Sequence, residues 1–461
     1  MTLYVIGFVI VFLLVLASGF PVGFGLGFLA LGLFTAYTGF DMAMTIGIEK
    51  AYTSLDSSIL VAIPLFIFAA QLISETGMGK RLFDAARTFL GRMPSGLGTA
   101  TIASSGVFAA MTGSSFVAAS TMGLIAIPEL RKARFSDTLI SAAITAGGSL
   151  GMIIPPSIIM ILYGYLTDES IGKLFMAGMI PGLLLVVLYS LALSFCYRFE
   201  ERGKARRRRV LSAVGADVAA GAAVLVSGSN PGAREIGPDP VATMSRLRAL
   251  KEAFWGLMAP VIILGGIYLG IFTAPEAAAI AVVYCMVIGF VVYRTLTISK
   301  LWGVLISSTT ISAMVAVIVI GGAMLAQVIV YGRIPQQILE VIIAKDFSPL
   351  VLLLLINIVL FVLGMFLEVL ALVYLAIPLL YPVVLYMGWD NIWFAVILLM
   401  NANLALITPP MGGVLYIVSQ IGAIPLNKVI KGALLPVFVL IFVLILVVFF
   451  PALATWLPSL M

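Results

Sequence analysis

The chain has 461 residues, of which 62% are hydrophobic and 10% are charged, with a net charge of +6. Soluble domains average about 45–50% apolar and about 25% charged residues. This composition leaves too little polar surface for a soluble globule, which excludes cytosolic enzymes, nucleic-acid-binding proteins and disordered proteins. The sequence has no histidine, which also excludes HExxH metalloproteases, haem ligation by His and His-based triads.

Apolar runs predict an all-α polytopic membrane protein, because a helix needs about 20 apolar residues to cross a bilayer. A membrane β-barrel would show short alternating strands instead. The chain begins without the basic stretch of a signal peptide, so its first run is expected to be a span. The predicted spans are 3–19, 22–40, 59–77, 136–165, 173–197, 254–272, 276–293, 304–331, 392–420 and 433–450, and two further apolar regions, 95–130 and 348–387, are interrupted near their middles.

A basic segment separates the two halves of the chain. Residues 198–253 are basic at both ends and rich in Ala, Gly and Ser. The most apolar part of this segment, Val210–Ser227, contains Asp217 and little bulk, which argues against a membrane span. We therefore predict a cytoplasmic linker that contains at most a short surface helix.

The two halves resemble each other at an offset of 254 or 255 residues. If each interrupted region is a re-entrant hairpin, each half has an odd number of crossings and the second half is inverted. Inverted repeats are typical of secondary transporters. The expected repeats are 1–197, with a hairpin at 95–130 and a broken helix at 136–165, and 254–461, with a hairpin at 348–387 and a broken helix at 392–420. Matching positions are Pro21 and Pro275, Gly77–Met93 and Gly332–Phe347, 153–157 and 407–411, Lys173 and Lys428, and Pro181 and Pro436.

The distribution of positive charge indicates the orientation of the spans. With both termini in the periplasm and both hairpins re-entrant, nearly all of the 26 Lys and Arg residues fall in cytoplasmic segments. This asymmetry follows the positive-inside rule. The exceptions are Lys50, Lys173, Arg333 and Lys345.

Four stretches interrupt the helical pattern inside apolar surroundings: 112–115, 147–157, 363–368 and 401–413. Broken helices expose N–H groups that attract anions, and their carbonyl and hydroxyl oxygens suit Na⁺. Close helix packing or plain proline kinks are the alternative interpretation. The candidate substrate-binding side chains are Ser114, Ser115, Ser157, Asn401, Asn403 and Thr408.

Glu368 lies in the interrupted region of the second half. A carboxylate at membrane depth costs about 2.5–3.5 kcal/mol and generally indicates function. A cation ligand is the first interpretation, and a proton carrier or a helix cap are the alternatives. Glu276 instead follows Pro275 and is expected to complement a helix N-terminus.

Several motifs resemble the large membrane subunit of the tripartite ATP-independent periplasmic (TRAP) transporters. The similarity covers nearly the whole chain and differs in detail, with TAPEA at 273–277, Met411 after the second di-proline and a bulky Phe116 beside a hairpin tip. The supporting stretches are AIPLFIFA at 62–69, MTGSSFVAASTMGLIAIPEL at 111–130, GGSLGMIIPPSIIMILYG at 147–164, SIGKLFMAGMIPGLLL at 170–185, GIFTAPEAAA at 270–279, LGMFLE at 363–368 and ITPPMGG at 407–413.

This resemblance implies an elevator mechanism, with a fixed scaffold and a moving transport domain in a bacterial inner membrane. It implies a Na⁺-driven importer of small organic acids that works with a small four-helix membrane subunit and a periplasmic substrate-binding protein. It also implies two Na⁺ sites at the helix breaks. One would involve Gly113, Ser114, Ser115, Gly151 and Pro155, and the other Glu368, Thr408 and Met411.

Three other functions are weighed against this one. A self-sufficient organic-anion carrier coupled to Na⁺ or H⁺ could have a related inverted fold. An intramembrane hydrolase using Ser114 or Ser115 would need a general base, and the sequence has no histidine. An ion channel is disfavoured by the paired hairpins. The sequence contains no GxxxxGK[ST] motif for ATP.

Overall fold

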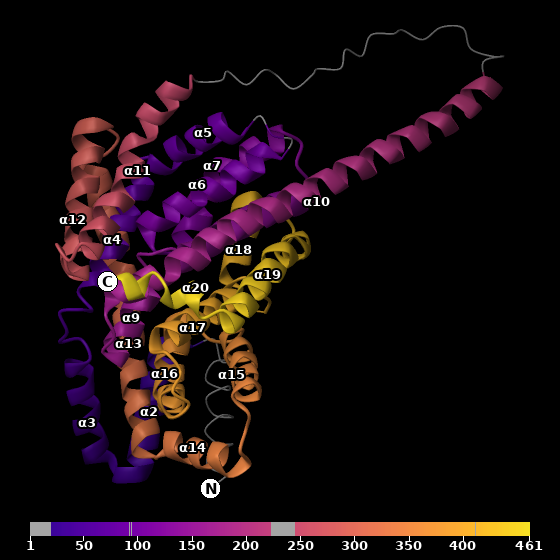
Figure 1. Ribbon diagram of the computed structural model, residues 1–461. Helices are drawn as coiled ribbons and strands as arrows, with labels where there is room; N and C mark the ends of the chain where they lie inside the picture. The colour runs from indigo at the N-terminus through magenta and orange to yellow at the C-terminus, as the bar shows by residue number, and fades with distance from the viewer. Residues whose placement is uncertain (1–19, 92, 94, 223–244, 411) are drawn as a thin grey trace.

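The computed structural model describes residues 20–461 except 92, 94, 223–244 and 411, and gives only the backbone for 206–222 (Figure 1). The predicted span 3–19 and the candidate ligand Met411 therefore lie outside the described residues. Within them, 7 helices are long and apolar enough to cross a membrane, and a pair bent by 61°, Ala62–Glu75 with Met78–Leu90, would make an eighth. The chain is a multi-pass helical membrane protein.

The first part of the described chain contains short helices. Helix α2 (Val22–Thr38) is followed by α3 (Phe40–Thr53), which the apolar pattern did not predict. Gly39, with φ of +84°, allows the chain to turn between them. Helices α4 (Ala62–Glu75) and α5 (Met78–Leu90) form the bent pair, and Gly77 adopts a left-handed conformation at the bend.

The interrupted region at 95–130 is occupied by two helices, α6 (Gly96–Thr112) and α7 (Ser115–Lys132). Gly113 ends α6 in a left-handed conformation, and the hydroxyl of Ser114 caps α7. The next span is divided at two consecutive prolines into α8 (Asp137–Ile153) and α9 (Ile158–Thr167). Proline removes a backbone donor and clashes with the preceding turn, which ends α8 there.

Helix α10 (Ile171–Ala222) is much longer than the predicted span 173–197. It continues without interruption into the segment predicted as a linker, and α11 (Arg246–Tyr268) begins on the other side of residues 223–244. Arg, Lys, Ala and Glu dominate residues 198–209, and all four favour helix. Part of 198–253 is therefore a continuation of a membrane helix.

From its interrupted region onward, the second part of the chain presents the same order of elements as the first part: two helices, a divided helix and a long helix. Two long helices come first, then a short one, two helices in the interrupted region 348–387, a divided helix and a final long helix (Figure 1). The bounds are α12 (Ala274–Val287, continued by a π-turn at Ile288–Val292), α13 (Ile298–Tyr331), α14 (Ile334–Lys345), α15 (Pro349–Gly364), α16 (Val369–Tyr386), α17 (Asn391–Leu406), α18 (Gly413–Gly422), α19 (Leu426–Phe449), α20 (Ala452–Thr455) and a 3₁₀ turn at Pro458–Leu460.

The divided helix α8–α9 is the most deeply buried span. Over its most apolar stretch it is 94% buried, whereas the corresponding stretch of α10 is 28% buried and faces outward. Helices α6, α7, α17 and α19 pack around α8, and α2, α4, α12 and α13 pack together elsewhere in the molecule. Glycines permit the closest approaches, since a Cβ at Gly322 of α13 would lie 2.6 Å from the ring of Tyr374 in α16.

Candidate functional site at the helix breaks

The first hairpin tip rests directly on the break between α8 and α9. A Cβ on Gly113, at the tip, would collide with the carbonyl oxygen of Pro156. A Cβ on Gly151, in α8, would lie 2.6 Å from the carbonyl oxygen of Ser114 and 2.8 Å from the Cα of Ser115. Only glycine fits at these two positions. The structure therefore brings together Gly113, Ser114, Ser115 and Gly151 beside the break that contains Pro155.

The second divided helix lies against the same region. A Cβ on Gly413, at the start of α18, would lie 2.6 Å from the ring of Phe116 in α7. The side-chain amide of Asn403 in α17 donates a hydrogen bond of 2.9 Å to the carbonyl oxygen of Ser149 in α8. The two divided helices, which come from opposite halves of the chain, therefore meet at their breaks. Both breaks contain a cis peptide bond, Pro155–Pro156 and Pro409–Pro410.

The second hairpin packs on α17 through a pair of asparagines. The amide of Asn401 donates 2.7 Å to Oδ1 of Asn357 in α15 and 2.9 Å to the carbonyl oxygen of Ile397. Both amide hydrogens of Asn401 are therefore committed within the protein. Asn357 was not among the residues predicted from sequence, although it is the sole polar side chain in the apolar helix Pro349–Gly364.

Breaking the asparagine pair should destabilise the protein. Asn357→Leu leaves a buried amide donor of Asn401 without its acceptor, which should cost about 1–3 kcal/mol. Thermal unfolding of the purified chain measures the loss. Asn401→Leu should cost a similar amount, and the double replacement should cost less than the sum of the two. Additive losses would show that the two side chains are not energetically coupled.

Glu368 caps the N-terminus of α16. Its Oε2 accepts hydrogen bonds from the backbone N–H groups of Leu370 at 2.9 Å and Ala371 at 3.4 Å. This geometry shows a helix cap, one of the alternatives raised by the sequence. The other carboxylate oxygen, Oε1, accepts no hydrogen bond from the described residues. Only one of the two carboxylate oxygens therefore takes part in the cap.

Several buried oxygen atoms at the breaks lack a hydrogen-bond partner within the described part of the chain. They are Oγ of Ser115, Oγ of Ser157 and Oδ1 of Asn403, and their residues are at most 2% exposed. A buried polar atom without a partner is costly, and it requires an explanation such as an ion or water. Neutral hydroxyl and amide oxygens are hard ligands that suit Na⁺.

The remaining candidate hydroxyls are already engaged. The hydroxyl of Thr408 donates 2.5 Å to the carbonyl oxygen of Leu404, and that of Ser114 accepts from the N–H of Val117 at 3.4 Å. A hydroxyl that donates still has lone pairs, so Thr408 retains the capacity to bind a cation.

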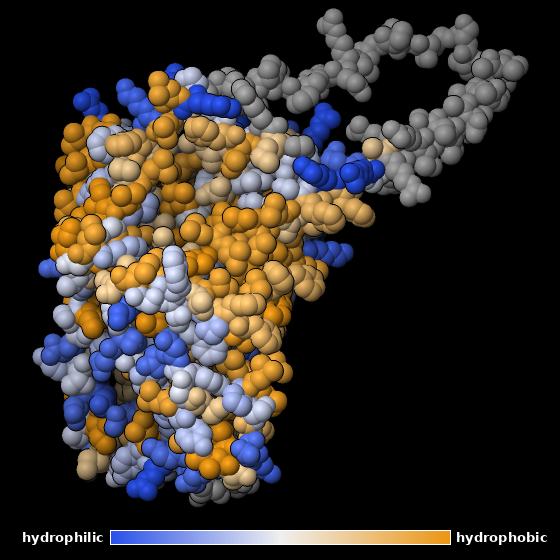
Figure 2. All heavy atoms as spheres, in the orientation of Figure 1, coloured by the Kyte–Doolittle hydropathy of each residue, from blue (hydrophilic) through white to orange (hydrophobic). Residues whose placement is uncertain are grey.

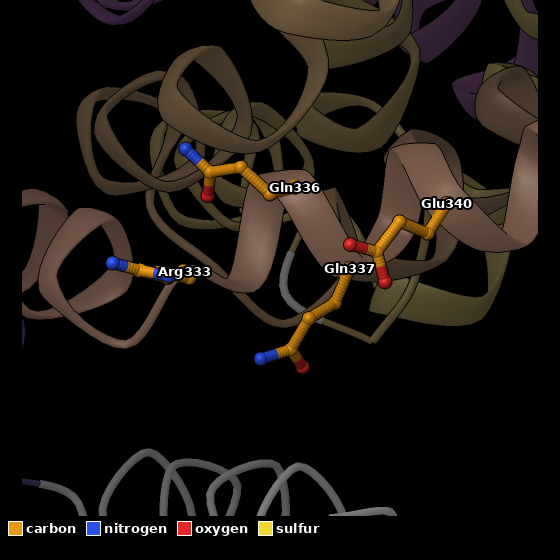
Figure 3. Close-up of a pocket in the computed structure, with 4 residues that line it drawn as sticks. All are labelled: Arg333, Gln336, Gln337 and Glu340. Carbon is orange, nitrogen blue, oxygen red and sulfur yellow. The ribbon is translucent and has the colours of Figure 1, made fainter.

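Two surface cavities lie away from these residues. One, of about 470 Å³, is lined by Arg333, just before α14, and by Gln336, Gln337 and Glu340, which project from α14 (Figure 3). The other, of about 450 Å³, includes Lys173, Asp390 and Trp456 in its lining. Neither cavity is lined by a residue predicted for binding, so the helix breaks remain the candidate site.

These features define a multi-pass membrane protein with a polar site buried where helices break. Residues 9–453 match the family described as "Tripartite ATP-independent periplasmic transporter, DctM component". The chain therefore belongs to this family, which confirms the resemblance seen in the sequence. It is a transporter permease and not an enzyme.

Three relatives illustrate the match. The chain is 34% identical to the sialic acid TRAP transporter large permease protein SiaM of Vibrio cholerae, over 96% of each chain. It is 32% identical to the C4-dicarboxylate TRAP transporter large permease protein DctM of Pseudomonas aeruginosa, over 89% of this chain and 88% of the relative. It is also 33% identical to the sialic acid TRAP transporter permease protein SiaT of Haemophilus influenzae, over 98% of this chain and 68% of that longer protein.

Proposed function

We propose that this permease imports small organic acids in a Na⁺-driven, binding-protein-dependent manner. The observation that carries the proposal is the set of buried, unpartnered oxygens at helix breaks that meet from opposite halves of the chain. The relatives named for sialic acid and for C4-dicarboxylates support a carboxylate as substrate. The breaks contain no Lys or Arg, so a carboxylate would be held by helix N-termini, polar side chains and bound Na⁺.

The chemistry of the breaks fits Na⁺ as the coupling ion. We assign one Na⁺ site to Gly113, Ser114, Ser115, Gly151 and Pro155, and a second to Glu368, Thr408 and Met411. Ser115 offers an unpartnered hydroxyl to the first site. Glu368 offers the oxygen that does not cap α16 to the second. The substrate would contact Ser114, Ser115, Ser157, Asn403 and Thr408. Asn401 would contribute its amide oxygen alone, because both of its amide hydrogens are donated within the protein.

We propose that the two halves, 1–197 and 254–461, are inverted repeats. Each half would contribute to both a fixed scaffold and a moving transport domain. The shared order of elements and the meeting of both divided helices support this division. The hairpins and divided helices would move together, because α7 packs on α8 and α18, α15 and α16 pack on α17, and α17 contacts α8. The contact of Gly322 in α13 with Tyr374 in α16 would then lie on the interface along which the transport domain slides past the scaffold.

A small four-helix membrane subunit and a periplasmic binding protein are the proposed partners, in a bacterial inner membrane. SiaT, of which this chain covers 68%, contains a further segment beyond the match. That length is consistent with a second membrane subunit joined to the large one in that relative.

Reconstitution tests the proposed function. We expect proteoliposomes holding both membrane subunits to accumulate organic acid only when the binding protein and an inward Na⁺ gradient are both present. Ser114→Trp should abolish this uptake, because it places bulk at the hairpin tip that touches Gly151. Robust uptake by this chain alone without Na⁺ would instead favour the self-sufficient carrier.

Cysteine labelling tests the proposed topology, with both termini periplasmic and 198–253 cytoplasmic. In a chain with Cys196→Ser and Cys285→Ser, an impermeant thiol reagent added to intact cells should label Ser459→Cys, which is exposed near the C-terminus. Ser212→Cys should be labelled only after the membrane is permeabilised. Labelling of Ser212→Cys in intact cells would contradict this orientation.

A further inference from the structure

Helix α10 is too long to lie wholly within a membrane. At about 1.5 Å per residue, its 52 residues extend about 78 Å, more than twice the roughly 30 Å of a bilayer core. The N-terminal part packs on α6, α8 and α19, and the C-terminal part projects from the body of the protein (Figure 1). Part of α10 must therefore lie outside the bilayer, and the side chains along the helix indicate where it leaves.

An apolar stripe marks the part of α10 that faces lipid. Leu183, Val187, Leu191, Phe195 and Phe199 follow one another at intervals of four residues and are 57%, 54%, 61%, 71% and 73% exposed. Residues four apart are neighbours on a helix surface, so the stripe is continuous and winds gradually around α10. Large apolar side chains this exposed require a hydrocarbon environment, so the stripe extends the membrane-facing surface to Phe199.

A basic run begins where the apolar stripe ends. Arg198 and Arg202 are exposed and form no ion pair with the described residues. The two acids between them share one partner, since Lys204 lies 2.9 Å from Glu200 and 3.0 Å from Glu201. The sequence then adds Arg206, Arg207, Arg208 and Arg209. Figure 2 shows the same succession, with hydrophobic surface giving way to hydrophilic groups toward the projecting segment.

We propose that this basic collar, Arg198–Arg209, binds the headgroups of anionic phospholipids. A cluster of Lys and Arg immediately beyond a membrane helix attracts anionic lipid, and each residue near the surface contributes a several-fold preference. Continuity with the lipid-facing stripe favours lipid over nucleic acid or a soluble acidic protein, because it holds the first arginines at headgroup depth. The bound lipid would act on the helices that carry the candidate site, since α10 packs on α6 and α8.

Lipid-selective fluorescence quenching tests the collar. Gly203 lies within it, and a Cβ there would meet no atom within 4 Å, so Gly203→Cys can carry a fluorophore in a chain with Cys196→Ser and Cys285→Ser. The labelled chain is placed in bilayers containing brominated phosphatidylglycerol or brominated phosphatidylcholine. We expect phosphatidylglycerol to associate several-fold more strongly. The preference should disappear in about 1 M salt, where the Debye length is about 3 Å.

Matched charge variants identify the residues responsible. Replacing Arg198, Arg202 and Lys204 by Gln should lower the preference for phosphatidylglycerol several-fold, with Arg206–Arg209 retained. Replacing Arg246, Arg248 and Lys251 of α11 by Gln removes the same charge and should leave this preference high. Equal quenching by both lipids in the unchanged chain, or an equal loss in the two variants, would overturn the proposal. The test measures no transport, so its outcome is independent of the proposed substrate and coupling ion.

Discussion

Gly113→Ala is expected to abolish transport and to destabilise the protein by about 3 kcal/mol. A non-glycine residue in the left-handed conformation costs about 1–2 kcal/mol, and overpacking of a tight contact adds about 1–3 kcal/mol. Both costs apply here, since Gly113 has φ of +61° and its Cβ would collide with the carbonyl of Pro156. Thermal unfolding and Na⁺-driven uptake in proteoliposomes measure the two effects.

Gly388→Ala is the matched control. Gly388 has φ of +65°, but a Cβ there would meet no atom within 4 Å. This replacement carries the cost of backbone strain without the collision, so it should destabilise by about 1–2 kcal/mol and leave uptake largely intact. If both alanine variants transport equally well, the contact between the hairpin tip and the break of α8 is not needed for function.

Glu368→Gln should separate the two roles of this side chain. The glutamine carbonyl can still accept the hydrogen bonds that cap α16, so stability should change by less than about 1 kcal/mol. The charge offered to a cation is lost, and an interaction with a charged group contributes about 1.5–3 kcal/mol. We therefore expect the Na⁺ concentration for half-maximal uptake to rise at least about tenfold.

Glu276→Gln provides the comparison, because Glu276 also accepts a backbone hydrogen bond at a helix start. Its Oε2 accepts from the N–H of Thr273 at 2.8 Å in a capping box on α12. It is exposed and lies on none of the helices that form the breaks, so its replacement should leave the Na⁺ response unchanged. The same Na⁺ response in both variants and in the unchanged chain would restrict Glu368 to its capping role.

The sequence by itself determined the class of protein and the positions of the breaks. Membrane spans can be predicted from sequence because every apolar residue in a long run favours the hydrocarbon core of the bilayer. The breaks are readable because Gly113 and the prolines at 155–156 and 409–410 act on the local backbone. The family was recognisable for the same reason, since its motifs are short and contiguous.

Only the tertiary structure decided which polar groups have partners. Asn401 was predicted to bind substrate, but its amide hydrogens are taken by Asn357 and Ile397. Asn403 is fixed by Ser149, whereas the hydroxyls of Ser115 and Ser157 have no partner among the described residues. These differences arise because a hydrogen bond between helices depends on which distant segments pack together. Local sequence patterns do not contain that information, so similar polar residues at the breaks have different roles.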